Sequence, residues 1–189
     1  MNRVGMTRNF TLLQRLLHWL MAIAILAMLF VGVGMVSTAA PKYVSLVTTH
    51  KTLGIAILVL AVIRIVVRLR SGTPPLPADL PEPMKLGAQL SHYALYALML
   101  AMPLIGWGMV SSAGYPVTLL WGIQLPSILP HSDALHALLW KAHVALAFAF
   151  FALILLHIAA GLFHALVRRD GVFESMATGS ARDRVTPAE

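Results

Sequence analysis

Five histidines lie in or at the edge of long apolar stretches of the chain, where an imidazole meets little water. These histidines are His18, His50, His92, His143 and His157. The hydrocarbon core of a bilayer makes an ionisable side chain costly, so such residues usually have a functional partner there. Imidazole is the commonest metal ligand among protein side chains and a regular axial ligand of haem iron. The histidines therefore predict a membrane protein that binds b-type haem.

The composition of the 189-residue chain is typical of a membrane protein. Hydrophobic residues make up 59% and charged residues only 11%, whereas soluble domains carry about 25% charged residues. The chain has no cysteine, which excludes disulfides, iron–sulfur clusters, thiolate-bound haem and covalent c-type haem. The formal net charge is +7, but the basic residues stand at the ends of apolar segments, which argues against nucleic-acid binding. We expect any haem to be held without covalent links.

Four apolar segments are long enough to cross a membrane. They span about residues 16–36, 47–69, 90–111 and 138–167. Each meets the requirement of about 20 residues for a spanning helix, and the continuous apolar runs argue against strands. The sequence predicts an all-α bundle of four transmembrane helices over residues 1–168 and a polar cytoplasmic tail over 169–189. We expect the first segment to be retained, because its apolar run exceeds that of a signal peptide.

The basic residues predict the orientation. One side of the membrane receives Arg3, Arg8, Arg15, Arg64, Arg68, Arg70, Lys85, Arg168, Arg169, Arg182 and Arg184, and the other receives Lys42, Lys51 and Lys141. The positive-inside rule then places both termini in the cytoplasm. Residues 71–89 are rich in proline and predict an extended cytoplasmic connector. Residues 112–137 form the long outer loop, in which we expect His131 and His136 to be solvated.

The depth of the histidines predicts how they pair. His50 and His143 lie near the outer ends of their helices, and His18 and His157 lie further in. His143 and His157 are 14 residues apart, which is a rise of about 21 Å on one helical face. The fourth helix can therefore offer one ligand to each of two stacked haems, His50 with His143 outside and His18 with His157 inside. The inner pair requires a tilted first helix or a fourth helix that extends into the cytoplasm.

Other residues have open roles. Arg64, 14 residues after His50, either faces an inner haem propionate or snorkels to the interface. His92 is a candidate for iron ligation, for contact with a propionate or quinone, or for an interfacial position. His164 either touches a quinone headgroup or is interfacial.

The residue types also bear on two alternatives to haem, a zinc site and a proton or ion transporter. A zinc site needs converging ligands, whereas the histidines fall into two groups on opposite sides of the bilayer. A proton or ion transporter usually carries Asp or Glu in its spanning helices, and the four predicted segments have none. Both alternatives are therefore disfavoured.

The ordered motifs resemble the bacterial cytochrome b561 family, four-helix di-haem b proteins of the inner membrane. The resemblance covers about residues 8–178 and rests on Leu17-His18-Trp19, His50-Lys51-Thr52-Leu53-Gly54, Arg64 with Arg68-Leu69, His92 with Tyr96, Pro103-Leu104-Ile105-Gly106, Lys141-Ala142-His143, Leu156-His157-Ile158-Ala159-Ala160, His164 and Arg169-Asp170-Gly171-Val172. It implies the axial iron ligands His18, His50, His143 and His157.

The resemblance also implies a function, a superoxide:ubiquinone oxidoreductase with two non-covalent b haems. Ubiquinone, superoxide and membrane lipid are then the partners, and no partner protein is required. Two histidines leave the iron no open position, so we expect outer-sphere transfer and name no catalytic residue. Lys42, Lys51 and Lys141 either attract superoxide or anchor the helices. The alternative function is a haem-bearing anchor and electron conduit for a separate dehydrogenase or hydrogenase.

Overall fold

The computed structural model describes residues 9–38 and 41–179. Its elements in chain order are α1 (Leu12–Ser37), α2 (Lys42–Ser71), α3 (Glu82–Ser112), β1 (Val117–Thr118), the 3-10 turn η1 (Leu120–Gly122), β2 (Gln124–Leu125), α4 (Asp133–Leu162), the π-helical turn η2 (Phe163–Arg168) and α5 (Val172–Ala177). The basic residues Arg3, Arg8, Arg182 and Arg184 lie outside the described residues. So do residues 39–40, which separate α1 from α2.

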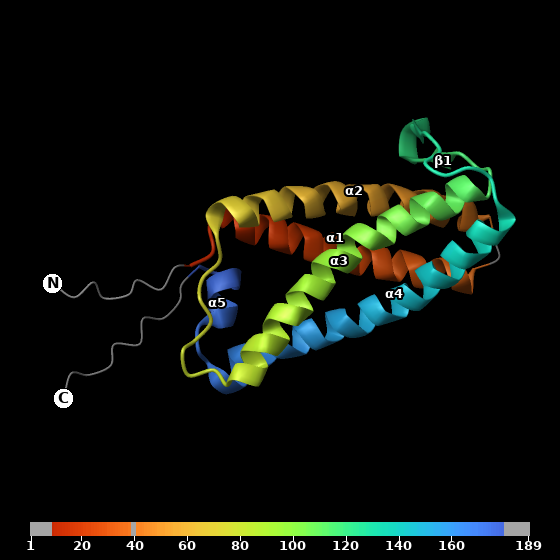
Figure 1. Ribbon diagram of the computed structural model, residues 1–189. Coiled ribbons are helices and arrows are strands. Elements are labelled where there is room, and N and C mark those ends of the chain that lie inside the picture. The colour runs from red at the N-terminus through yellow and green to blue at the C-terminus, as the bar shows by residue number, and fades with distance from the viewer. Residues whose placement is uncertain (1–8, 39–40, 180–189) are drawn as a thin grey trace, which may run out of the picture.

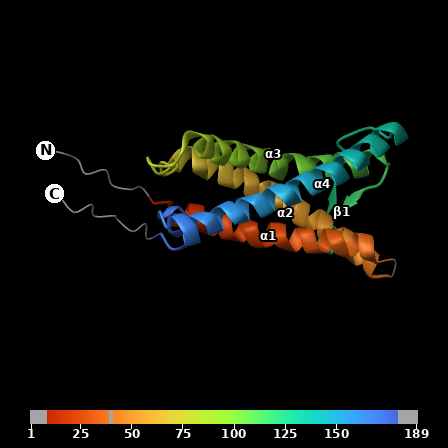
Figure 2. The ribbon, with the colours of Figure 1, turned by 90° about the horizontal axis from the view of Figure 1, so that it is seen from below.

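The four long helices run lengthwise and form one bundle (Figure 1). All four are long and apolar enough to cross a membrane, which confirms the predicted four-helix membrane fold. Figure 2 shows the same bundle from below, with the short helix α5 at one end and the β1–β2 hairpin at the other. We call these the α5 end and the hairpin end. The α5 end holds the start of α1, the end of α2 and the start of α3.

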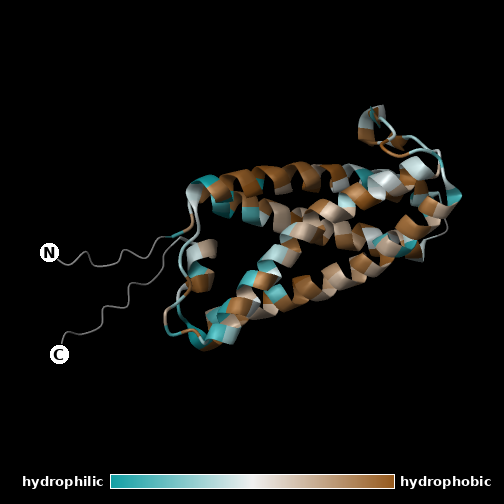
Figure 3. Cartoon of the chain, viewed as in Figure 1, coloured by the Kyte–Doolittle hydropathy of each residue, from teal (hydrophilic) through white to brown (hydrophobic). Residues whose placement is uncertain are grey.

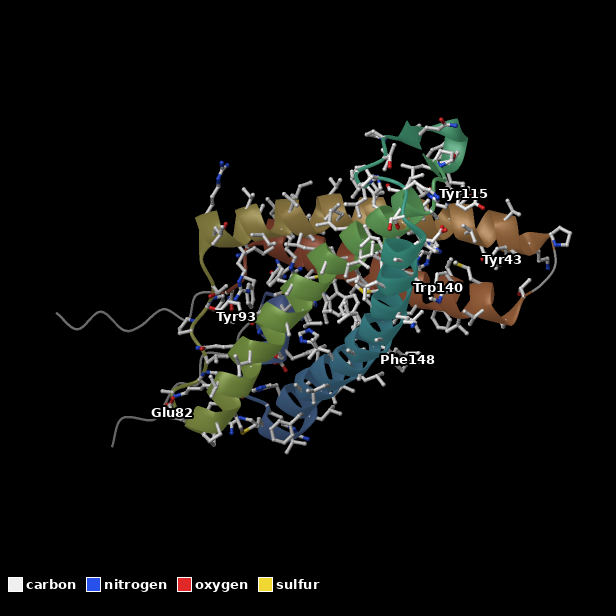
Figure 4. The ribbon with its side chains drawn as sticks, turned by 45° about the vertical axis from the view of Figure 1, so that its right-hand side comes forward. Tyr43, Glu82, Tyr93, Tyr115, Trp140 and Phe148 are labelled. Atoms are coloured by element: carbon white, nitrogen blue, oxygen red, sulfur yellow. The ribbon has the colours of Figure 1, made fainter. Side chains whose placement is uncertain are left out.

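The outer surface of the bundle is apolar over most of its length (Figure 3). Large side chains such as Phe30 and Phe148 are 78% and 74% exposed, and Phe148 points away from the other helices (Figure 4). A soluble protein rarely leaves so much contiguous apolar surface uncovered. This surface therefore faces lipid.

The helices do not pack evenly against one another. Within the described residues, α1 packs on α2, α2 on α3 and α3 on α4, whereas α4 does not approach α1 or α2 closely along its backbone. The central contacts are made by a small cluster of buried side chains at mid-height: Met21, Ala61, Met99, Phe150 and Ile154. The interfaces of α4 with α1 and α2 are therefore wide on both sides of this cluster.

Local hydrogen bonds define the helix ends at the α5 end. Thr11 and Gln14 form a capping box at the start of α1, with N···O distances of 3.2 and 2.9 Å, which satisfies two backbone donors of the first turn. The Gln14 amide also donates to the Gly72 carbonyl at 2.8 Å. Gly72, at φ +69°, ends α2 in a conformation that favours glycine. The start of α1 is thus tied to the end of α2.

All four long helices begin earlier than the hydropathy predicts, at residues 12, 42, 82 and 133 instead of 16, 47, 90 and 138, and α3 differs most. The proline-rich connector expected over residues 71–89 spans only 72–81, because α3 begins at Glu82. Pro83 is compatible with this, since proline is favoured in the first turn of a helix. Similarly, α4 begins at Asp133 with Ser132 as its cap. Hydropathy detects only the lipid-facing part of a helix, and these first turns are polar.

Part of the segment predicted as a polar tail is helical. After η2 the chain turns at Arg169 and Gly171, both with positive φ, and α5 follows. Trp19 Nε1 of α1 donates to the Met176 carbonyl at 3.4 Å. The tail therefore folds back over the start of α1 at residues 172–177.

A short hairpin occupies the loop between α3 and α4. β1 and β2 are antiparallel, with Val117 opposite Leu125. The hairpin is held on the bundle by a hydrogen bond of 2.9 Å from the Leu120 N–H to Thr52 Oγ1 of α2. A second bond of 2.9 Å runs from Trp107 Nε1 to the Pro126 carbonyl.

Candidate functional site

The first imidazole pair lies towards the α5 end. His18 of α1 and His157 of α4 have ring centroids 6.2 Å apart, with the rings inclined by 64°. His92 of α3 lies beside them, its ring centroid 5.5 Å from that of His157. The depths of His18 and His157 therefore do match, because α4 and η2 continue to Arg168 and carry His157 well inside the bundle.

The second pair lies towards the hairpin end. His50 of α2 and His143 of α4 have ring centroids 6.1 Å apart, with the rings inclined by 67°. The Nδ1 atoms of both are buried, and neither has a hydrogen-bond partner among the described residues. Buried polar atoms are nearly always paired. These two are therefore not ordinary core histidines satisfied by their neighbours.

The spacing of both pairs suits a shared metal centre. Imidazole nitrogens bind a metal at about 2 Å, so two rings on opposite sides of one ion have centres about 6 Å apart. The pairs at 6.2 and 6.1 Å meet this requirement. Both pairs also span the interfaces of α4 with α1 and α2, where the helix backbones do not approach closely. The donor set therefore fits two bis-histidine haem sites.

Glycines lie beside the second pair. A Cβ atom built on Gly106 of α3 would lie 3.3 Å from His143 Cε1, and one built on Gly32 of α1 would lie 4.0 Å from His50 Cε1. A contact of 3.3 Å requires the neighbour to give way. Close packing in the dense interior of a bundle makes such a shift costly. Glycine at 106 therefore preserves the position of the His143 ring.

Arg64 lies beside the first pair rather than at the membrane surface. Its Nε donates a 3.0 Å hydrogen bond to the Tyr96 hydroxyl, and its Nη1 is buried without a partner among the described residues. It is close enough to interact electrostatically with His18 and His157. A buried guanidinium N–H without an acceptor is suited to an anion such as a haem propionate.

His92 does not complete a zinc site. Although it lies next to His157, no group of three or more His, Asp or Glu side chains in the described ranges converges on a single point that would hold a metal ion. The arrangement at the α5 end is thus one facing pair with a third imidazole at its side. The role of His92 as a cofactor contact stays a prediction.

The three lysines lie in the hairpin half of the bundle. Lys51 follows His50 in the sequence, and Lys141 stands two residues before His143. Lys42 is the first residue of α2 and lies about 12 Å of helical rise from His50. Lys42 and Lys141 are exposed and Lys51 is half-buried. None of them forms an ion pair within the described part of the chain. Their positive charges are therefore uncompensated there.

Of the two loop histidines expected to be solvated, His131 is exposed, with 66% of its side chain accessible, whereas His136 is half-buried. His136 Nδ1 lies 2.9 Å from the Met109 carbonyl and His131 Nδ1 lies 3.1 Å from the Ser112 carbonyl. The Met109 carbonyl also accepts from the Ala113 N–H, and the Ser112 carbonyl also accepts from the Ser132 N–H. These rings therefore bind the end of α3 to the start of α4, and their role is structural.

A polar network at the α5 end has no counterpart in the sequence-based predictions. Asp170 Oδ2 accepts hydrogen bonds from His164 Nδ1 at 2.8 Å and Arg168 Nε at 2.9 Å, and Arg168 Nη2 reaches Asp79 of the connector at 2.8 Å. The Asp170 side chain is only 4% exposed. Burial alone would raise the pKa of Asp170, but the hydrogen bonds from Arg168, His164 and the Val172 N–H outweigh it and lower the pKa.

The chain is similar to known proteins over most of its length. The family model described as prokaryotic cytochrome b561 matches residues 9–179. A protein of Yersinia pestis named probable superoxide oxidase CybB is 32% identical over 178 residues, covering 90% of this chain and 97% of that protein. Cytochrome b561 homolog 2 of Escherichia coli (strain K12) is 29% identical over 169 residues, covering 88% and 89%. Homolog 1 of the same strain is 28% identical over 176 residues, covering 89% and 96%.

Proposed function

The chain belongs to the prokaryotic cytochrome b561 family, and from this we propose that it is a di-haem b cytochrome that oxidises superoxide and reduces ubiquinone. Membership confirms the resemblance noted in the sequence and implies b-type haem in a multi-pass membrane protein. The name of the Yersinia pestis relative supports superoxide as the electron donor. In the overall reaction, two superoxide anions become dioxygen while one ubiquinone takes up two electrons and two protons.

One observation carries the proposal. The imidazoles of two half-buried histidine pairs face each other at 6.2 and 6.1 Å, and one member of each pair belongs to α4. His143 and His157 lie on one face of that helix, separated by about 21 Å of rise. We assign His18 and His157 to one haem and His50 and His143 to the other.

Each haem, when bound, supplies a one-electron carrier, and the chain supplies its surroundings. Two histidines would hold each haem, and the oxidation of superoxide there would need no acid, base or nucleophile from the chain. The apolar cluster around Met21 and Phe150 excludes water between the two sites. Arg64 offers its free Nη1 to an anionic propionate at the α5 end, and His92 lies within reach of the same cofactor.

The lysines give the hairpin end a preference for anions. Lys51 and Lys141 stand next to the histidines of the second pair in the sequence, and Lys42 stands farther out. Asp133, the first residue of α4, is the acidic residue of that helix nearest to these lysines in the sequence. Its side chain is 96% exposed. Uncompensated positive charge at a site mouth raises the encounter rate of a small anion.

The distribution of arginine orients the protein in the bacterial inner membrane. Every arginine among the described residues belongs to the α5 half of the bundle: Arg15, Arg64, Arg68, Arg70, Arg168 and Arg169. By the positive-inside rule the α5 end and both termini face the cytoplasm. Superoxide then reacts at the outer, hairpin end.

The proposal is tested with the purified full-length chain. We expect two b haems per chain, and under a superoxide flux one ubiquinol for every two superoxide anions consumed. Excess superoxide dismutase should abolish quinol formation. A preparation with fewer than two haems would contradict the di-haem assignment. A haem-loaded protein that does not oxidise superoxide would instead favour the alternative function, an electron conduit for a separate dehydrogenase.

A further inference from the structure

Tyr96 of α3 is the meeting point of two arginines from α2. Arg64 Nε donates to its hydroxyl at 3.0 Å. The guanidinium carbon atoms of Arg64 and Arg68 lie 6.0 and 5.7 Å from the centre of its ring. These distances are in the range of cation–π attraction. One tyrosine thus binds two cations that are a single helical turn apart.

The arginines are enclosed on the side towards the α5 end. A cavity of about 10 Å³ adjoins them, room for about one water molecule, and its walls are Phe10, Gln14, Arg64, Val67, Arg68, Tyr96 and Met176. Phe10 precedes α1 and Met176 belongs to α5, so the folded tail covers this cluster. A long arginine side chain would otherwise snorkel towards water. The hydroxyl of Tyr96 and this cover together keep Arg64 turned inwards.

The position of Arg64 matters because no acidic side chain among the described residues neutralises its positive charge. No carboxylate forms an ion pair with Arg64 anywhere in residues 9–38 and 41–179. Its positive charge interacts with the imidazoles of His18 and His157. A positive charge in a poorly solvated interior acts much more strongly on a nearby charge than it would in water.

At the hairpin end, no lysine or arginine among the described residues acts appreciably on His50 or His143, whereas Arg64 acts on His18 and His157. The hairpin end is therefore the less positive of the two. Its cations are Lys42, Lys51 and Lys141, of which two are exposed and one is half-buried. Charges near solvent are screened by water and salt. The two histidine pairs therefore lie in unequal fields, with the stronger positive field at His18 and His157.

We propose that Tyr96 is a positioning residue that holds Arg64 beside the His18–His157 pair and so raises the midpoint potential of the haem bound there. This inference rests on the proposed di-haem function. The reduced cofactor carries one more negative charge than the oxidised cofactor, and a fixed cation stabilises it. The asymmetry gives electrons a thermodynamic preference for the haem at the α5 end.

The test is a redox titration of the haem-loaded Tyr96→Phe protein. Phenylalanine keeps the ring but removes the acceptor of the Arg64 hydrogen bond. We expect the equilibrium constant for reduction of the haem at the α5 end to fall about threefold, which is about 30 mV at 59 mV per tenfold change. The other haem should be unchanged. A His50→Ala background, which should retain only the haem at the α5 end, assigns the shifted component.

Tyr93→Phe is the matched control. Tyr93 lies one turn earlier on the same helix, is 70% exposed and is directed to the lipid side (Figure 4). The same chemical change there should leave both potentials unaltered. Arg64→Gln should lower the α5-end potential at least as much as Tyr96→Phe. The double variant should add little, because Arg64→Gln removes the charge that Tyr96→Phe only releases from its position.

The outcomes separate the inference from the function on which it rests. A wild-type protein with fewer than two haems overturns the proposed function. Two bound haems with unchanged potentials in Tyr96→Phe overturn the role of Tyr96. If Tyr96→Phe fails to hold haem, Arg64→Gln decides instead, and an unchanged potential in that variant overturns the inference as well.

Discussion

The imidazoles of His50 and His143 face each other at 6.1 Å across an interface where α2 and α4 do not otherwise pack closely. Two half-buried rings at this separation, each with a buried Nδ1 atom that has no partner among the described residues, are a costly arrangement for a protein that binds nothing between them. A cofactor ligated by both rings explains the spacing and the width of the interface together. The same relationship holds at the other end for His18 and His157.

Removal of one ring should empty one site selectively. We expect His143→Ala to lower the haem content from two per chain to one, because a single imidazole cannot complete a bis-histidine site. The measurement is the haem-to-protein ratio of the purified variant. His131→Ala is the matched control at the same end, since His131 binds the Ser112 carbonyl and should leave two haems. Retention of both haems by His143→Ala would contradict the assignment.

A methyl group beside His143 should disturb the site without harming the helix. A Cβ at position 106 would lie 3.3 Å from His143 Cε1, so Gly106→Ala must push the ring. Alanine is also favoured over glycine within a helix by about 1 kcal/mol, so α3 itself should not weaken. We expect lower haem occupancy or an altered b-type absorbance band at the hairpin-end site.

Gly87→Ala is the matched control, because it makes the same substitution in α3 at a position where a methyl group has room. No atom lies within 4 Å of a Cβ built on Gly87, which is also in α3. This variant should keep the wild-type spectrum and a thermal stability at least equal to that of the wild type. Equal spectra for Gly87→Ala and Gly106→Ala would show that glycine at 106 does not serve the His143 ring.

Much of this fold follows from simple patterns, for identifiable reasons. Hydropathy finds the four spans because lipid demands continuous apolar helices. The spacing of His143 and His157 places them on one face of a helix, whatever the rest of the structure does. The structure brings His18 to His157 and His50 to His143, and the role of all four as iron ligands stays a prediction. The early start of α3 at Glu82 was missed because its first turns are polar.

Other features depend on tertiary contacts that no local pattern encodes. Asp79 and Arg168 are 89 positions apart in the chain, and only the folded bundle brings them together. The bond between Arg64 and Tyr96 spans 32 positions. A tyrosine in an apolar helix is typical of an interface anchor, so Tyr96 offered no signal beyond its place in a family motif. The helix α5 is short and mixed in character, which hides it among polar residues.

The lysines at the hairpin end should control the encounter with superoxide. We expect the Lys51→Glu/Lys141→Glu protein to lose about threefold to tenfold in kcat/KM for superoxide at low ionic strength, because the local field changes sign. Lys42→Glu should have a smaller effect, since Lys42 lies farther from His50. The measurement is superoxide-dependent ubiquinone reduction at several salt concentrations.

Salt provides the internal check on this prediction. The wild-type rate should fall as the Debye length shortens from about 30 Å at 0.01 M to about 10 Å at 0.1 M, whereas the double variant should lose that fall. Lys85→Gln is the control, because Lys85 lies at the α5 end in an ion pair with Glu82. An equal loss in Lys85→Gln would assign the effect to net charge rather than to the hairpin end.

The Asp170 network should make stability depend on acid pH. The pKa of Asp170 is lowered in the folded protein, so the carboxylate stabilises the fold above its unfolded pKa of about 3.9. That stabilisation is lost as the pH falls through the lower folded value, because the unfolded chain then binds the proton more readily. We expect Asp170→Asn to have a lower Tm than the wild type near neutral pH. The difference should shrink progressively below about pH 4, as thermal unfolding in detergent would show.

Asp133→Asn controls for the loss of a carboxylate as such. The Asp133 side chain is 96% exposed, and its one ion pair in the described part of the chain is a 3.8 Å contact with His131. Removal of this carboxylate should therefore change the Tm little at any pH. Asp170→Asn should also loosen the end of η2, because asparagine offers one neutral oxygen in place of the carboxylate that binds His164, Arg168 and the Val172 N–H. Faster proteolysis after residue 168 in Asp170→Asn, but not in Asp133→Asn, would show this loosening. A Tm difference for Asp170→Asn that stays constant down to pH 3 would contradict a lowered pKa.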